Sequence, residues 1–160
     1  MRKSIVAGVV VGGLILMAPV SPAGATKTKD PCKTLKTSEI AVAFGDAPVA
    51  AGAKDSRSPL PLCQWTVSAS GNLPEGTVSV FLQTTGAKLA YDAHKKETAS
   101  YEPVEGLKNA LYYSVGPAVE VLKGKALLNV QGVFLDPDSI DAVDVKDQLV
   151  QLAKKASARV

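Results

Sequence analysis

Hydrophobic and polar residues alternate along several short segments of this chain, which is the period of a half-buried β-strand. The clearest segment is 77–85, where Val78, Val80 and Leu82 alternate with polar residues. Four further segments have strand character, namely 62–69, 110–115, 118–123 and 125–134. The last three are separated only by Gly116-Pro117 and Gly124, and loops this short join antiparallel neighbours. The pattern therefore predicts an antiparallel sheet of about five strands that ends in a meander.

Three other segments space their apolar residues in helical steps of three and four. The first begins with Thr37 as its N-cap and stops at Gly45. The second covers 87–98, with Leu89, Ala90 and Ala93 as its apolar side.

The third helix is expected to start at Asp136-Pro137-Asp138 and to place Val145, Leu149, Leu152 and Ala156 on one face. Acidic residues at its start and basic residues at its end suit the helix dipole. The predicted order is α-β-β-α-β-β-β-α, which is an α+β fold with the helices mainly on one face of the sheet.

The first 25 residues differ in composition from the rest. Arg2 and Lys3 precede an uncharged apolar run over 5–20, and Ala23-Gly24-Ala25 supplies the small residues of a signal-peptidase site. A retained membrane anchor is the competing interpretation, but the run is shorter than the roughly twenty residues that span a bilayer. We expect residues 1–25 to be a signal peptide cleaved after Ala25, and no lipid anchor, because no Cys lies at the cut. A polar stub over 26–31 and a single domain over 32–157 would follow.

The cysteine content agrees with export. Cys32 and Cys63 are the only two cysteines, and a lone pair in a small extracytoplasmic domain is usually a disulfide. A redox or metal role is the alternative, but the pair has neither CxxC spacing nor a nearby His. The sequence therefore predicts a structural disulfide in a secreted or envelope protein.

Charge and motifs exclude several functions. Arg2 and Lys3 account for two of the 18 Lys and Arg residues, so the rest of the chain is nearly neutral against 15 Asp and Glu, and nucleic acid is not an expected partner. No catalytic serine motif, phosphate-binding loop or metal-ligand spacing is present. His94, the single histidine, falls among charged residues of the 87–98 helix, which indicates a solvated surface imidazole rather than a general base. We expect no cofactor, no metal and no enzymatic activity.

Acidic residues leave one catalytic alternative open. Glu102 and Glu105 flank Pro103, and Asp136 precedes the last helix. Two carboxylates at a suitable separation can hydrolyse a glycoside, so an envelope hydrolase is the alternative hypothesis. The same residues also suit loop solvation and helix capping.

One face of the predicted sheet could bind a ligand. Phe81 occupies a polar position of its strand, and one residue of the pair Tyr112 and Tyr113 must point outward because neighbours alternate. We take Tyr112 as the outward tyrosine and add Leu122 and Leu127 to the same face. These four residues form a candidate binding face, unless loops cover them at the sheet edge.

Five short motifs occur in order along the chain: Asp30-Pro31-Cys32, Ala43-Phe44-Gly45, Cys63-Gln64-Trp65, Val104-Glu105-Gly106-Leu107 and a closing amphipathic helix. With them, the chain from Asp30 to Ser157 resembles the small exported proteins and lipoproteins of unknown function found in actinobacteria. Many of those relatives carry a lipid-modified Cys, which is missing here, and tend to have Gly where this chain has Lys108. The resemblance implies an exported α+β domain with paired cysteines, and it implies no activity or site.

The expected function is a monomeric, non-catalytic binding or accessory domain of the cell envelope, without a membrane span once the leader is removed. Its ligand would be a small molecule, a wall component or a partner protein. A structural or assembly protein without a ligand is a further alternative.

Overall fold

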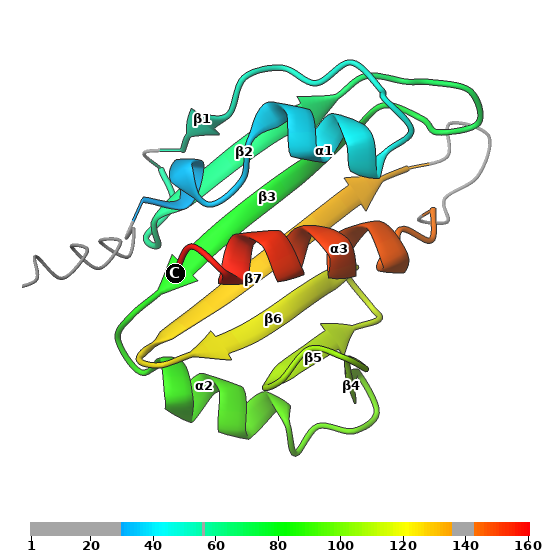
Figure 1. Cartoon of the computed structure of the whole chain (residues 1–160). Coiled ribbons are helices and arrows are strands. Elements are labelled where there is room, and N and C mark those ends of the chain that lie inside the picture. The colour runs from blue at the N-terminus through cyan, green and yellow to red at the C-terminus, as the bar shows by residue number, and fades with distance from the viewer. Residues whose placement is uncertain (1–29, 56, 136–142) are drawn as a thin grey trace, which may run out of the picture.

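The computed structural model of this chain describes residues 30–55, 57–135 and 143–160, and within them one antiparallel sheet runs through the molecule (Figure 1). The strands are β1 (Ala53–Lys54), β2 (Leu62–Val67), β3 (Gly76–Gln83), β4 (Tyr101–Pro103), β5 (Ala110–Tyr113), β6 (Ala118–Lys123) and β7 (Ala126–Phe134). The helices are the 3-10 turn η1 (Pro31–Lys33) and α1 (Thr37–Ala43), α2 (Ala87–His94) and α3 (Lys146–Ser157).

The α+β class and the antiparallel sheet are confirmed, but the predicted strand number and element order are wrong. The described sheet has 7 strands in the order β1-β2-β3-β7-β6-β5-β4. The two additional strands, β1 and β4, lie at the sheet edges and contain 2 and 3 residues. Segments this short cannot show an alternating pattern, so the sequence indicated loops instead.

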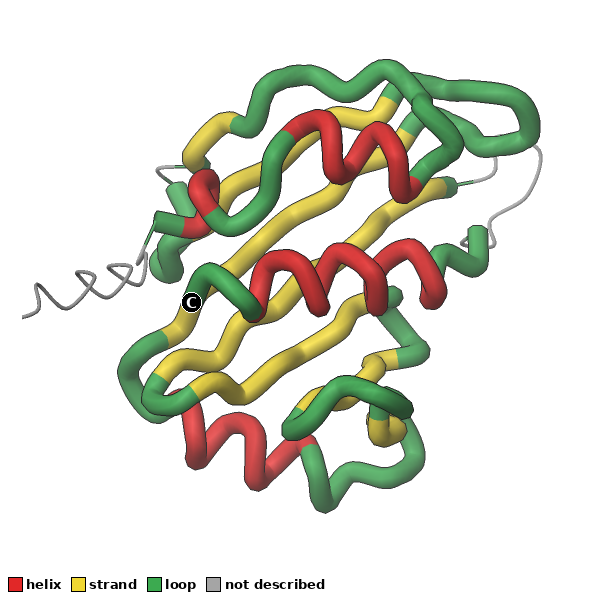
Figure 2. Tube along the Cα trace, in the orientation of Figure 1, coloured by secondary structure: helices red, strands yellow, loops and turns green. Residues whose placement is uncertain are grey.

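The strand order results from one long excursion of the chain. After β3 the chain passes through α2 to the far edge at β4, and the meander β4-β5-β6-β7 then returns to the centre (Figures 1 and 2). Strand β7 pairs with β3 from Gly76 opposite Phe134 to Gln83 opposite Leu127. The two central strands thus come from distant parts of the sequence.

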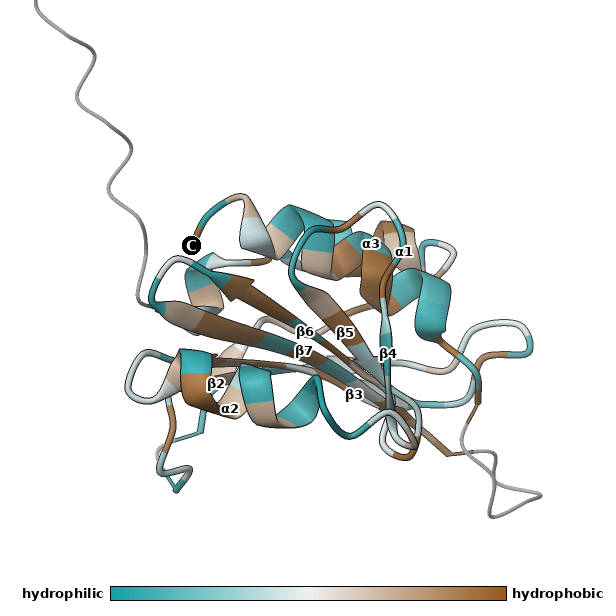
Figure 3. Cartoon of the chain, turned by 90° about the horizontal axis from the view of Figure 1, so that it is seen from below, coloured by the Kyte–Doolittle hydropathy of each residue, from teal (hydrophilic) through white to brown (hydrophobic). Residues whose placement is uncertain are grey.

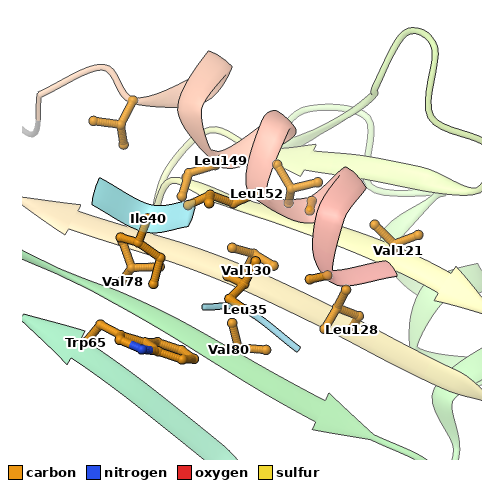
Figure 4. Close-up of a cluster of buried hydrophobic side chains, with 14 of the residues drawn as sticks. Leu35, Ile40, Trp65, Val78, Val80, Val121, Leu128, Val130, Leu149 and Leu152 are labelled. Atoms are coloured by element: carbon orange, nitrogen blue, oxygen red, sulfur yellow. The ribbon is translucent and has the colours of Figure 1, made fainter. Parts of the chain in front are cut away.

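The main core lies between one face of the sheet and the helices α1 and α3. Leu149 and Leu152 of α3 and Ile40 of α1 are fully buried against Val78 and Val130 of the central strands (Figure 4). Burying one such side chain contributes about 1.5–3 kcal/mol. The predicted apolar face of the last helix is therefore confirmed for its described residues.

The predicted start of that helix is wrong for its described part. Residues 143–145 are not helical, and α3 begins at Lys146. Asp136 and the rest of 136–142 lie outside the described residues. The Asp144 side chain accepts a hydrogen bond from the Lys146 backbone N–H at 3.0 Å, so this acidic residue precedes the helix and does not belong to it.

Helix α2 lies on the opposite face of the sheet from α1 and α3 (Figure 3). Its Ala87 and Tyr91 pack on Leu111 and Leu127, whose chain neighbours point into the main core. Of the predicted apolar side, Ala90 packs against this cluster, whereas Leu89 is 77% exposed and Ala93 is exposed, so the prediction is wrong for these two residues. The α2 helix also ends at His94 rather than at residue 98.

The predicted disulfide between Cys32 and Cys63 is present, and it ties η1 to β2. The predicted signal peptide, Ala25 and most of the stub 26–31 lie outside the described residues. Over the described ranges, none of the helices has the length and hydrophobicity needed to cross a membrane.

Candidate functional site

On the sheet face that α2 partly covers, an aromatic, an amide and a carboxylate side chain lie side by side across the central strands. The strand register aligns Phe81 of β3 with Asn129 of β7, and Asn129 with Glu120 of β6. A second row, two residues along each strand, contains Gln131, Ala118 and Tyr113, followed by Tyr101 on the edge strand β4. Residues in each row are neighbours because alternate residues of a strand share a face.

A cavity of ≈ 310 Å³ opens over these rows beside the C-terminal end of α2. Its volume falls within the range of small-molecule sites. The cavity is lined by Leu60, Phe81, Gln83, His94, Tyr101, Tyr113, Gly116, Ala118, Glu120, Leu127, Asn129 and Gln131. We call it the α2 cavity.

The polar centre of the α2 cavity is the buried carboxylate of Glu120, a residue that is only 5% exposed. Its Oε2 atom lies 2.7 Å from Nδ1 of His94, and its Oε1 accepts a hydrogen bond from Nδ2 of Asn129 at 3.1 Å. An ionised carboxylate only accepts hydrogen bonds, so Nδ1 of His94 carries the proton of this contact. In the neutral imidazole, Nε2 is then the acceptor nitrogen.

Three rings form a continuous stack along one wall. The His94 and Tyr101 rings lie 4.6 Å apart and nearly parallel, and the Tyr101 and Tyr113 rings lie 4.8 Å apart. Burial, together with the negative charge of Glu120, raises the pKa of the Tyr101 phenol to about 12. The Tyr101 side chain is therefore a neutral hydroxyl group at physiological pH.

Two of the four residues predicted for the candidate binding face lie in the α2 cavity. Phe81 and Leu127 both line the α2 cavity. Leu122 lies on the same face but packs at the edge of the cluster under α2.

The assignment of Tyr112 to this face is wrong. Tyr112 pairs with Val119 in the main core, and the ammonium of Lys146 lies 4.9 Å from its ring centre on the α3 side. Tyr113 is the outward tyrosine. Since Leu111 and Tyr112 are both apolar, the sequence of β5 gave no polar position from which to deduce its orientation.

The prediction that His94 is a solvated surface residue is also wrong. His94 follows Ala87 and Tyr91 by seven and three residues, which places it on the face of α2 that packs on the sheet. Its side chain is 31% exposed and contacts Glu120. One sequence signal could have indicated the site, because Glu120 shares a strand face with apolar Ala118 and Leu122.

The acidic residues proposed for a hydrolase do not approach the α2 cavity. Glu102 is exposed and ion-paired with Lys146, and Glu105 is exposed in the following loop. Asp136 lies outside the described residues. Nor do the described residues contain a group of three or more His, Cys, Asp or Glu side chains that could hold a metal ion.

A second hollow, of ≈ 460 Å³, lies over β1 and the outer face of β2. Its cations are already paired, Lys54 with Asp30 at 3.0 Å and Arg57 with Asp55 at 3.2 Å. None of the described residues that line it is aromatic. The α2 cavity is therefore the stronger candidate site.

No family model, curated protein or solved structure matches this chain. The resemblance to exported actinobacterial proteins thus gains no support and meets no contradiction from these comparisons.

Proposed function

We propose that this protein is an exported, non-catalytic binding domain of the cell envelope that holds a small ligand in the α2 cavity. The observation that carries the proposal is the polar cluster of His94, Glu120 and Asn129 at the base of a cavity walled by aromatic rings. A few fixed polar groups within a largely apolar lining are typical of small-molecule sites.

The energetics of Glu120 support a role in binding. Removing a carboxylate from water costs several kcal/mol, and an apolar side chain of similar volume is often neutral or stabilising at such a position. The neighbouring Ala118 and Leu122 show that this face of β6 accepts apolar residues. A buried Glu is therefore better explained by recognition of a ligand than by stability of the fold.

Unused hydrogen-bonding groups around the cavity give further support. Within the described residues, the hydroxyls of Tyr101 and Tyr113 and the amide of Gln131 make no hydrogen bond to the protein. The Oδ1 atom of Asn129 is buried and has no hydrogen-bond partner among the described residues. A bound ligand with polar groups could form hydrogen bonds with the two tyrosine hydroxyls and the Gln131 amide.

Export and absence of catalysis belong to the same proposal. The leader pattern of residues 1–25 supports export, and so does the disulfide. The described lining contains no Ser, Thr or Cys that could act as a nucleophile.

A hydrolase that uses water is the second candidate, and one observation favours it. A histidine whose Nδ1 is held by a buried carboxylate is oriented as a general base. In that case Nε2 of His94 would accept a proton from water, and the histidine rather than Glu102 or Glu105 would be the base.

Two variants on β3 test the binding proposal. Phe81 lines the α2 cavity, whereas Ser79 lies two residues away on the same face and does not line it. A library of small fragments is screened by two-dimensional NMR against the wild-type protein, Phe81→Ala and Ser79→Ala. We expect amide shifts that cluster at Gln83, Asn129 and Gln131, weakened by Phe81→Ala and unchanged by Ser79→Ala. The proposal would be contradicted if the fragments bind elsewhere on the protein, or if Phe81→Ala leaves the amide shifts as strong as Ser79→Ala does.

A further inference from the structure

The charged groups of the α2 cavity are of one sign. Among its described lining residues, Glu120 is the only carboxylate, and no Lys or Arg is present. His94 is the only lining group that can become cationic. An anionic ligand would therefore meet a negative charge and no permanent positive charge to offset it.

The charge of Glu120 is fixed in place but not cancelled when His94 is neutral. Its two oxygens receive hydrogen bonds from His94 and Asn129, both of which are then uncharged donors. Such bonds stabilise the ionised carboxylate and leave its full charge beside the cavity. In a partly buried site this charge acts more strongly than it would in water.

The Tyr101 phenol lies within the influence of Glu120. Burial is the largest cause of its raised pKa, and the negative charge of Glu120 is the next. Tyr101 lines the cavity and stacks on His94, so a positive charge is favoured over a negative one beside this ring as well.

Protonation of His94 would remove this field. The groups that face the imidazole are Glu120 from β6 and Tyr101 from β4, with Tyr113 stacked behind Tyr101. The facing residues of β7 are the uncharged Leu127, Asn129 and Gln131. The charged residues Lys95, Lys96 and Glu97 follow His94 in the chain and do not line the cavity. An imidazolium at His94 would form an ion pair with Glu120 and leave the centre of the cavity neutral.

We propose that the α2 cavity selects a ligand with an organic ammonium group, and that this cation and a proton on His94 exclude each other. This inference rests on the proposed function, because it assigns the ligand class of the same cavity. An amine of small size would supply the positive charge that Glu120 lacks when His94 is neutral. A neutral polyol or sugar is the principal competing ligand, and it would show no dependence on the charge of His94.

Three probes of nearly equal shape test the charge selection: benzylammonium, benzyl alcohol and benzoate. Their affinities are measured by NMR titration of the protein with its Cys32–Cys63 disulfide intact, at several pH values between about 5.5 and 8, where the ammonium keeps its charge. Imidazole resonances of His94 give its protonation state in the same samples. At pH 8 we expect benzylammonium to bind about tenfold more tightly than benzyl alcohol, and benzoate to bind most weakly.

The pH dependence tests the exclusion of the proton. The affinity for benzylammonium should fall in proportion to the fraction of His94 that its imidazole resonances show to be protonated, while the affinity for benzyl alcohol stays level. Glu120→Gln should remove the preference for the cation. His94→Asn should keep that preference and remove its pH dependence.

The outcomes separate this inference from the proposed function. Equal affinities of the three probes in the wild-type cavity, sensitive to Phe81→Ala, would overturn the ammonium selection and leave the binding function standing. A preference for the cation that does not change as His94 titrates would overturn the mutual exclusion. If no probe and no fragment binds the cavity, both proposals fail.

Discussion

Glu39 and Arg159 form a doubly hydrogen-bonded ion pair between the first helix and the last turn of the chain. Nη1 and Nη2 of Arg159 donate to the two carboxylate oxygens of Glu39 at 2.7 and 2.8 Å, and Nη1 also donates to the backbone carbonyl of Thr34 at 2.7 Å. The pair joins the two helices that cover the main core, because it links α1 to the residues that follow α3.

Replacing Glu39 by Gln should lower the stability of the protein at neutral pH. The hydrogen bonds from Arg159 lower the pKa of Glu39 from 4.5 to about 2, and a shift of that size corresponds to about 3 kcal/mol. The stabilisation is complete above pH 4.5 and is lost as the pH falls through about 2, below which the carboxylate is protonated in both the folded and unfolded states. Urea denaturation of wild type and Glu39→Gln from pH 7 to pH 2 measures the difference.

The matched control for this experiment is Glu75→Gln, since Glu75 is exposed on the β2–β3 turn. It should leave the free energy of unfolding nearly unchanged at every pH. A difference between wild type and Glu39→Gln that persists undiminished at pH 2 would exclude the ion pair as its cause.

Removing the disulfide should cost about 3–4 kcal/mol of stability, because it closes a loop with a sequence separation of 31 residues. The double variant Cys32→Ala/Cys63→Ala can be compared with wild type by urea denaturation. Reductant should destabilise the wild-type protein by a similar amount and have no effect on the double variant. An equal response of both proteins to reductant would argue against this bond as the source of the stability.

Truncation of Leu152 should be far more damaging than truncation of Leu89. Leu152 is fully buried between α3 and the sheet, whereas Leu89 is 77% exposed on α2. We expect Leu152→Ala to lower the free energy of unfolding by about 2–5 kcal/mol and Leu89→Ala by less than about 0.5 kcal/mol. Thermal or chemical denaturation distinguishes the two, and similar effects would contradict the observed faces of these helices.

His94 should be found as the Nδ1–H tautomer when it is neutral, because Nδ1 faces the carboxylate of Glu120. The two nitrogen chemical shifts of the imidazole report the tautomer directly. In Glu120→Gln the preference should weaken, since an amide can either donate to or accept from Nδ1. A dominant Nε2–H tautomer in the wild-type protein would show that this contact does not form in solution.

Much of the sheet could be predicted because its strands follow simple rules. The alternation of Val78, Val80 and Leu82 fixes which face of β3 is buried, and the glycine turns between the last strands define the meander. The two cysteines could be paired from their number alone. These features depend on local patterns that tertiary contacts did not override.

The site could not be predicted to the same extent, because it depends on which side of the α2 helix packs on the sheet. The side chains of Leu89 and Tyr91 are both apolar enough to be buried, and only the packed structure shows that Tyr91 is the buried one. With the opposite choice, His94 rotates into solvent and its contact with Glu120 is lost. Tyr112 and Tyr113 present the same ambiguity, since a shift of one residue exchanges their faces.

The position of β7 has a consequence for the order in which the chain can fold. Its pairing with β3 joins residues as far apart as Gly76 and Phe134, so the two halves of the sheet have no shared backbone hydrogen bonds until the last strand is inserted between them. Non-local pairing of this kind slows folding. The two halves of the described sheet can therefore join only after the residues of β7, up to Phe134, have been synthesised.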